Sequence, residues 1–102
     1  MDQNISKGAQ RACSVRVISV NDVYMLDNFP RLCTLIKEES TDNTLTLLAG
    51  DFLAPSLLAS LDKGVSMVRM MNMLPISHVC FGNHEADHGV EELVLRIQES
   101  FL

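Results

Sequence analysis

Three short polar stretches of this sequence carry residues that can hold metal ions or move a proton. The richest is Gly82-Asn83-His84-Glu85-Ala86-Asp87, which combines an amide oxygen, an imidazole and carboxylates. Asn21-Asp22 and Gly50-Asp51 also come directly after apolar runs. Each stretch taken alone is what a tight turn or a helix cap requires. Their repetition after three apolar runs predicts one shared site.

The segments around these stretches alternate between strands and helices. Short runs rich in apolar and β-branched residues predict strands at 15–20, 44–49 and 78–81. Helical spacing and capping residues predict helices from Asp27 or Asn28 to about 39, at 57–61, at 65–74, and from Val90 onward. This β-α-β-α-α-β-α order predicts an α/β fold with a parallel sheet and right-handed crossovers. The polar, aperiodic residues 1–13 are expected to form a flexible tail.

Two helices have faces whose burial can be predicted. Between residues 65 and 74, a stripe at helical spacing is expected to pack in the core rather than to form a binding surface: Met67, Met70, Met71 and Leu74. In the last helix the residues expected to face inward are Val90, Leu93, Val94, Ile97 and Phe101. Those expected to face solvent are Glu91, Glu92, Arg96 and Glu99.

The polar residues that follow the strands are expected to meet. In an open parallel sheet the carboxyl ends of the strands share one edge, and ligands bind in the crevice outside it. Asp22, Asp51 and Asn83 each lie within two residues of a predicted strand end. Their oxygens, with the nitrogen of His84, suit Mn, Fe, Zn or Mg. From the middle strand, Asp51 is placed to bridge two such ions.

At these residues the sequence resembles the calcineurin-like metallophosphoesterases, and most of all their 5'-nucleotidase branch. The resemblance runs from about Val15 to the end of the chain, and its blocks are Asn21-Asp22-Val23, Gly50-Asp51-Phe52-Leu53-Ala54-Pro55-Ser56 and Gly82-Asn83-His84-Glu85-Ala86-Asp87. It implies that residues 14–102 are the N-terminal part of an α/β/β/α sandwich. It also implies a divalent-metal phosphoesterase that acts on a nucleotide or another phosphate ester.

The resemblance also implies a role for each site residue. Asp22 and Asp51 would bind the first of two divalent metal ions, Asp51 would bridge, and Asn83 would bind the second. His84 would contact the phosphate and protonate or stabilise the leaving oxygen, oriented by Asp87. An imidazole held by a carboxylate is suited to that task near neutral pH. Glu85 is interpreted as a supporting or helix-start residue rather than a ligand.

The sequence departs from the family pattern in two places. Family members usually carry Asp-x-His in the first block, where this chain has Tyr24. A phenol with a pKa of about 10 is a poor neutral-pH ligand, so Tyr24 is a doubtful metal ligand. No histidine follows His88, whereas the family supplies a further His and a Gly-His-x-His block. Two hypotheses stay open: the N-terminal fragment of a phosphoesterase, or a catalytically inactive short product or degenerate homologue that acts as a binding or interaction module.

Composition limits the class of partner. The net charge of −5, with eight scattered Lys and Arg residues, disfavours nucleic acid. No stretch approaches the roughly 20 apolar residues that span a bilayer, and the start lacks a signal-peptide core, so no membrane contact and a cytoplasmic location are expected. Three cysteines without CxxC spacing predict reduced, mostly buried thiols. An uncovered sheet face predicts self-association.

Overall fold

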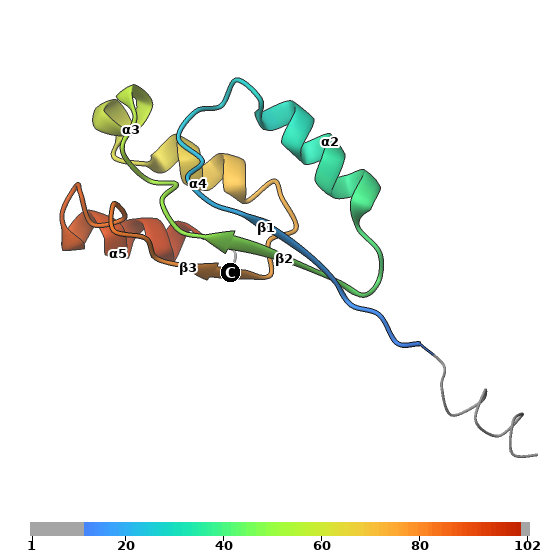
Figure 1. Ribbon diagram of the computed structural model, residues 1–102. Helices are drawn as coiled ribbons and strands as arrows, with labels where there is room; N and C mark the ends of the chain where they lie inside the picture. Colours follow the sequence, from blue (N-terminus) through green and yellow to red (C-terminus); the bar gives the residue numbers. More distant parts are fainter. Residues whose placement is uncertain (1–11, 101–102) are drawn as a thin grey trace, which may run out of the picture.

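In the computed structural model of the protein, which describes residues 12–100, strands and helices alternate along the chain (Figure 1). The strands β1 (Arg16–Val20), β2 (Thr44–Ala49) and β3 (His78–Cys80) form one parallel sheet in the order β1-β2-β3. The helices are α2 (Phe29–Glu39), α3 (Leu57–Asp62), α4 (Val65–Met71) and α5 (Val90–Glu99). The predicted α/β class, element order and parallel pairing are confirmed. The predicted tail lies outside the described residues except for residues 12 and 13, which are exposed and irregular.

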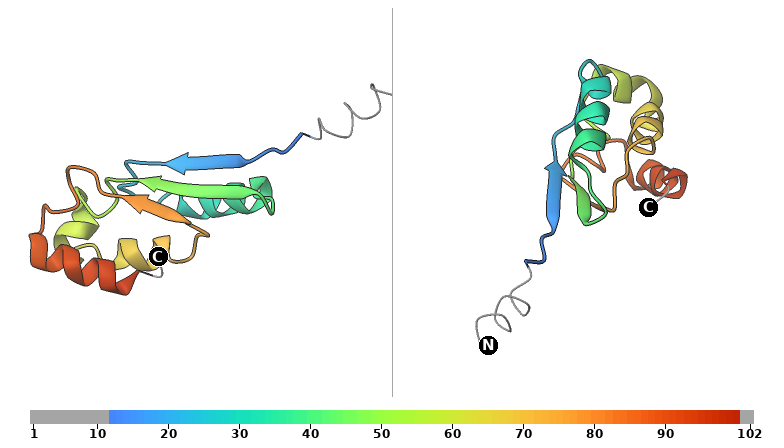
Figure 2. Two further views of the ribbon diagram at one scale, coloured as in Figure 1. Left: turned by 90° about the horizontal axis from the view of Figure 1, so that it is seen from below. Right: turned by 90° about the vertical axis from the view of Figure 1, so that its right-hand side faces the viewer.

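The sheet has one face covered by helices and one bare face. In β1, Ile18 and Val20 pack against the core, whereas Val17 before them and Ser19 between them are exposed. The register sets Ile18 beside Thr46 and Val20 beside Leu48, so inward-facing residues of neighbouring strands lie side by side. Seen from below, the arrowheads of all the strands point the same way (Figure 2). The bare face therefore consists of the alternate residues of each strand.

Local signals set most helix boundaries as predicted. Ser56 caps α3, because its side-chain oxygen accepts a hydrogen bond from the Ala59 N–H at 3.0 Å. Asn28 precedes α2, but its side chain makes no capping hydrogen bond, and a proline in the first turn favours the start instead. The helix predicted at 65–74 ends earlier, at Met71. Its stripe packs in the core as predicted, with Met67, Met71 and Leu74 buried.

The orientation of α5 contradicts the prediction from its apolar spacing. Val90, Val94 and Ile97 are exposed, whereas Arg96, expected in solvent, is only 6% exposed. Its Nη1 donates to the Lys63 carbonyl oxygen at 3.1 Å, and its Nη2 donates to Glu99 Oε1 at 2.9 Å. These contacts supply partners for the buried charge, which makes burial of its long apolar stem tolerable. Phe101 lies outside the described residues.

The cysteines are free, but the expectation that most are buried is wrong. Cys13 and Cys80 are exposed, and Cys33 is half-buried. Cys80 falls on the bare face of β3, because the alternation along the strand directs Val79 to the core instead. Among residues 12–100, no helix is both long and apolar enough to cross a bilayer.

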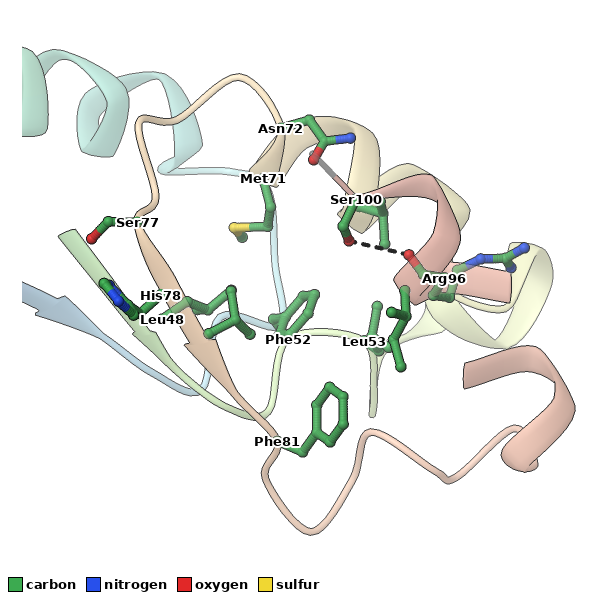
Figure 3. A pocket seen from close by; sticks show the side chains of 13 residues that line it. Leu48, Phe52, Leu53, Met71, Asn72, Ser77, His78, Phe81, Arg96 and Ser100 are labelled. Carbon is green, nitrogen blue, oxygen red and sulfur yellow. Dashed lines mark hydrogen bonds between the residues drawn. The ribbon is translucent and has the colours of Figure 1, made fainter. Parts of the chain in front are cut away.

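An apolar pocket of about 330 Å³ opens between β3, α4 and α5 (Figure 3). Phe52, Leu53 and Phe81 project into it beside Leu48 and Met71. Strand β3 is the last strand of the sheet order, so the pocket lies beside an edge strand. None of the site residues predicted from the sequence lines it.

Candidate functional site

The first block turns sharply where β1 ends. Asp22 has a φ of 53°, in the left-handed region that few non-glycine residues occupy. Its N–H donates to the Gly50 carbonyl oxygen at 3.2 Å, which ties this turn to the end of β2. The Tyr24 hydroxyl donates to Asp22 Oδ1 at 2.7 Å, and Asn21 Nδ2 donates to Oδ2. These two hydrogen bonds, that from Tyr24 first, hold the pKa of Asp22 below its ordinary value, so its carboxylate is ionised at neutral pH.

The second and third blocks touch because glycines leave room for the contact. Gly50 has a φ of 83°, and a Cβ added there would lie 2.5 Å from the Gly82 nitrogen. A Cβ on Gly82 would collide with the Asp51 carboxylate. At this close approach Asp51 Oδ1 accepts a hydrogen bond from the His84 N–H at 2.9 Å. The ends of β2 and β3 are thus joined directly through Asp51.

Glu85 connects the second and third blocks through hydrogen bonds to their backbone. It is 3% exposed, and each of its carboxylate oxygens accepts backbone hydrogen bonds. Oε2 accepts from Asp51 at 2.8 Å and from Gly82, and Oε1 accepts from Phe52 at 2.8 Å and from Leu53 at 3.3 Å. A buried carboxylate is stabilised by such a set of donors. The supporting role expected of Glu85 is therefore seen, but its extent was not predicted, because three of its partners lie more than 30 residues away.

His84 and Asp87 form the side-chain pair that their spacing predicts. His84 Nδ1 lies 2.7 Å from Asp87 Oδ2, within a turn in which the Asp87 N–H donates to the His84 carbonyl oxygen at 3.1 Å. The contact with Asp87 raises the pKa of His84, and the nearby charges of Asp51 and Glu85 act in the same direction. Nδ1 therefore pairs with Asp87, and Nε2 is the ring nitrogen that does not take part in this contact.

Tyr24 is bound to the carboxylate beside it. Its hydrogen bond to Asp22 raises the pKa of the phenol to about 12, and the charges of Asp51 and Glu85 contribute. A phenol that keeps its proton at neutral pH is a donor to Asp22 rather than a ligand.

The predicted residues are therefore brought to one edge without forming a closed site. Asp51, His84 and Asp87 form one chain of contacts, and the charge of His84 acts on Asp22. Asn83 lies exposed in the same loop as His84. Within residues 12–100, however, no group of three or more His, Cys, Asp or Glu side chains is arranged to hold a metal ion. The roles of these residues stay predictions.

Comparison with known proteins finds relatives of one chemical kind. The chain is 36% identical over 76 residues to the trifunctional nucleotide phosphoesterase protein YfkN of Bacillus subtilis and 36% identical over 66 residues to the 5'-nucleotidase of Rattus norvegicus. It is 32% identical over 77 residues to the 5'-nucleotidase of Homo sapiens. This chain resembles part of the 5'-nucleotidases. The three matches cover 72%, 65% and 74% of the chain, but only 5%, 11% and 13% of these relatives. No protein family model matches the chain.

Proposed function

We propose that this chain forms the N-terminal side of a two-metal phosphoesterase site that acts on nucleotides or related phosphate esters. The observation that carries the proposal is the hydrogen bond from the His84 N–H to Asp51 Oδ1, because it joins the third polar block to the second at the carboxyl edge of the sheet. The relatives, which are 5'-nucleotidases and a nucleotide phosphoesterase, support the same chemistry. In this proposal the sheet belongs to the α/β/β/α sandwich of the calcineurin-like metallophosphoesterases.

The donor atoms of the chain suit divalent cations in kind but not in number. Asp22 and Asp51 would hold one ion, Asp51 would also reach a second, and Asn83 would add its amide oxygen. Residues 12–100 contain no group of three or more acidic, His or Cys side chains that could hold a metal ion. In this proposal the remaining metal ligands therefore come from residues outside 12–100. When bound, such ions supply an activated water and neutralise phosphate charge.

His84 and Asp87 provide the proton chemistry in this proposal. Asp87 holds Nδ1, which sets the orientation of the ring and its tautomer. Its carboxylate also raises the pKa of His84, which favours the imidazolium near neutral pH. Nε2–H can then donate to a phosphate oxygen or to the leaving oxygen as the ester bond breaks.

A second candidate function is a binding module without catalysis, and Tyr24 is the observation that favours it. Tyr24 stands where the family has its first-block histidine. Its phenol keeps its proton at neutral pH and donates a hydrogen bond to Asp22 Oδ1. A cation at Asp22 has to compete with that hydrogen bond, which weakens the first metal site.

Titration with Mn²⁺, followed by paramagnetic broadening of amide NMR signals, tests the proposed function. We expect broadening centred on Asp22, Asp51 and Asn83 that is lost in Asp51→Asn. Asp42→Asn is the matched control, because Asp42 precedes β2 at the opposite edge of the sheet. Uniform or absent broadening would contradict the proposed site. Specific binding without hydrolysis of p-nitrophenyl phosphate, both in this chain and in a longer protein that contains it, would favour the binding module.

A further inference from the structure

Strand β3 carries a histidine and a cysteine on the bare face of the sheet. His78 and Cys80 are two positions apart, so both project from the side of the strand opposite to Val79, which packs against the core. Both residues are exposed. The His78 ring points away from Phe52 and Phe81 (Figure 3). The pair therefore faces solvent on the side of the sheet that the helices leave uncovered.

The spacing and chemistry of this pair suit a metal ion. Residues two positions apart on a strand have Cα atoms about 6.6 Å apart, and two side chains that leave the same face at that spacing can converge on one ion. An imidazole nitrogen and a thiolate sulfur are the ligands that zinc prefers in structural sites. Within residues 12–100, neither the His78 nor the Cys80 side chain makes a hydrogen bond or an ion pair. Both are therefore available to bind.

One copy of the chain supplies only half of such a site. Structural zinc is almost always held by four ligands in a tetrahedron. Across residues 12–100, no group of three or more His, Cys, Asp or Glu side chains could hold a metal ion, so no third such ligand joins His78 and Cys80. A second copy that brings the same pair completes a set of two cysteines and two histidines. A two-fold axis through the ion gives this arrangement, because both copies then present the same surface.

The surroundings of the pair allow a second copy to approach. Strand β3 is at the edge of the sheet order, and no strand in the described part of the chain pairs with its outer side. Residues 75–83 include no Lys, Arg, Asp or Glu, so β3 lacks the charged side chains with which proteins commonly block contact at an edge strand. The register places Leu47 beside His78 and Ala49 beside Cys80. Two copies can therefore meet at β3 without bringing like charges of this segment together.

We infer that two copies of the chain bind one zinc ion between them through His78 and Cys80 of each copy. Each thiol loses its proton to solvent when its sulfur binds the metal, and the two thiolates balance the charge of the ion. The thiolate ligands distinguish this site from the oxygen-rich phosphoesterase site, since Mn²⁺ and Mg²⁺ prefer carboxylate and carbonyl oxygens. The inference does not depend on the proposed function.

Sedimentation equilibrium of the reduced, metal-free chain, titrated with Zn²⁺, tests the inference. We expect the mass to rise to twice its value in EDTA, to stop rising at one Zn²⁺ per two chains, and to return when EDTA is added. Mn²⁺ should leave the mass unchanged. His78→Ala and Cys80→Ser should each abolish the rise. Cys13→Ser is the matched control, because Cys13 is also an exposed free cysteine but lies before β1. Asp51→Asn, which alters the proposed phosphoesterase site, should also leave the rise intact.

Co²⁺ in place of Zn²⁺ gives a second readout, because a thiolate bound to Co²⁺ produces a charge-transfer absorption band that oxygen ligands do not. We expect this band in the unaltered chain and its loss in Cys80→Ser. An unchanged mass with Zn²⁺ would overturn the inference, as would one Zn²⁺ bound per chain without association. A rise that persists in both His78→Ala and Cys80→Ser, or that EDTA does not reverse, would also overturn it, because the two copies would then associate without the proposed metal bridge.

Discussion

Replacing Glu85 by Gln removes the contact on which the second and third blocks depend. The change keeps the size of the side chain but turns one carboxylate oxygen into an NH₂ group. That NH₂ group must face N–H donors, either those of Asp51 and Gly82 or those of Phe52 and Leu53. Two backbone donors then lose their acceptor in a buried place.

The cost follows from the number of donors left without a partner. A buried donor that loses its acceptor costs about 1–3 kcal/mol, so two cost about 2–6 kcal/mol. A native protein is stable by only about 5–15 kcal/mol, so Glu85→Gln removes a large part of the free energy of unfolding. We expect the urea midpoint to fall by more than about 1 M.

Equilibrium urea unfolding, followed by circular dichroism, measures this loss. Glu38→Gln is the matched control, since Glu38 is exposed on α2 and its change should stay within about 0.5 kcal/mol. Amide hydrogen exchange of the unaltered protein is a second measurement, in which the amides of Asp51 and Phe52 should be protected by Glu85. Equal midpoints for the two variants, together with fast exchange at these amides, would refute the role given to Glu85.

Four further predictions concern separate features. Asp87→Asn should lower the pKa of His84 toward its ordinary value of 6.5, because the carboxylate is the main cause of the rise, and an NMR titration that shows no change would contradict this. Asp62 accepts from the Gly64 and Ser66 N–H groups at the start of α4; partial burial raises the pKa of its carboxyl, but hydrogen bonds to Ser66 and Gly64 outweigh this and lower it. Its stabilisation is therefore present above the unfolded pKa of about 3.8 and lost as pH falls through the lower folded pKa. Asp62→Ala should cost about 1 kcal/mol at pH 7, with urea midpoints that converge with those of the unaltered protein in acid; a constant difference would argue against it. The chain by itself should show no Mn²⁺-dependent hydrolysis of p-nitrophenyl phosphate, and turnover that disappears in His84→Ala would contradict that. The bare sheet face should cause self-association that sedimentation detects and Val17→Lys reduces, whereas a monomer at all concentrations would count against it.

Local patterns in the sequence were enough to predict the elements and to mark the edge of the sheet that carries polar residues. The bounds of β2 at 44–49 were predicted correctly, and so was the cap at Ser56, because alternation and capping depend on neighbours a few residues apart. The contact between His84 and Asp87 was predicted for the same reason, since they are three positions apart along the chain. The placement of Asp22, Asp51 and Asn83 at strand ends needed only the element order and the parallel pairing.

Contacts between distant parts of the chain could not be read in this way. The spacing of α5 indicates an apolar face but not which side packs inward, and burial of Arg96 depends on the carbonyl of Lys63. Likewise, Glu85 gathers its donors from a loop far away in sequence, and the hydroxyl of Tyr24 could be assigned to Asp22 only once the turn was known. A periodic pattern specifies which residues share a face, whereas partners for a buried charge are specified only when the elements have packed.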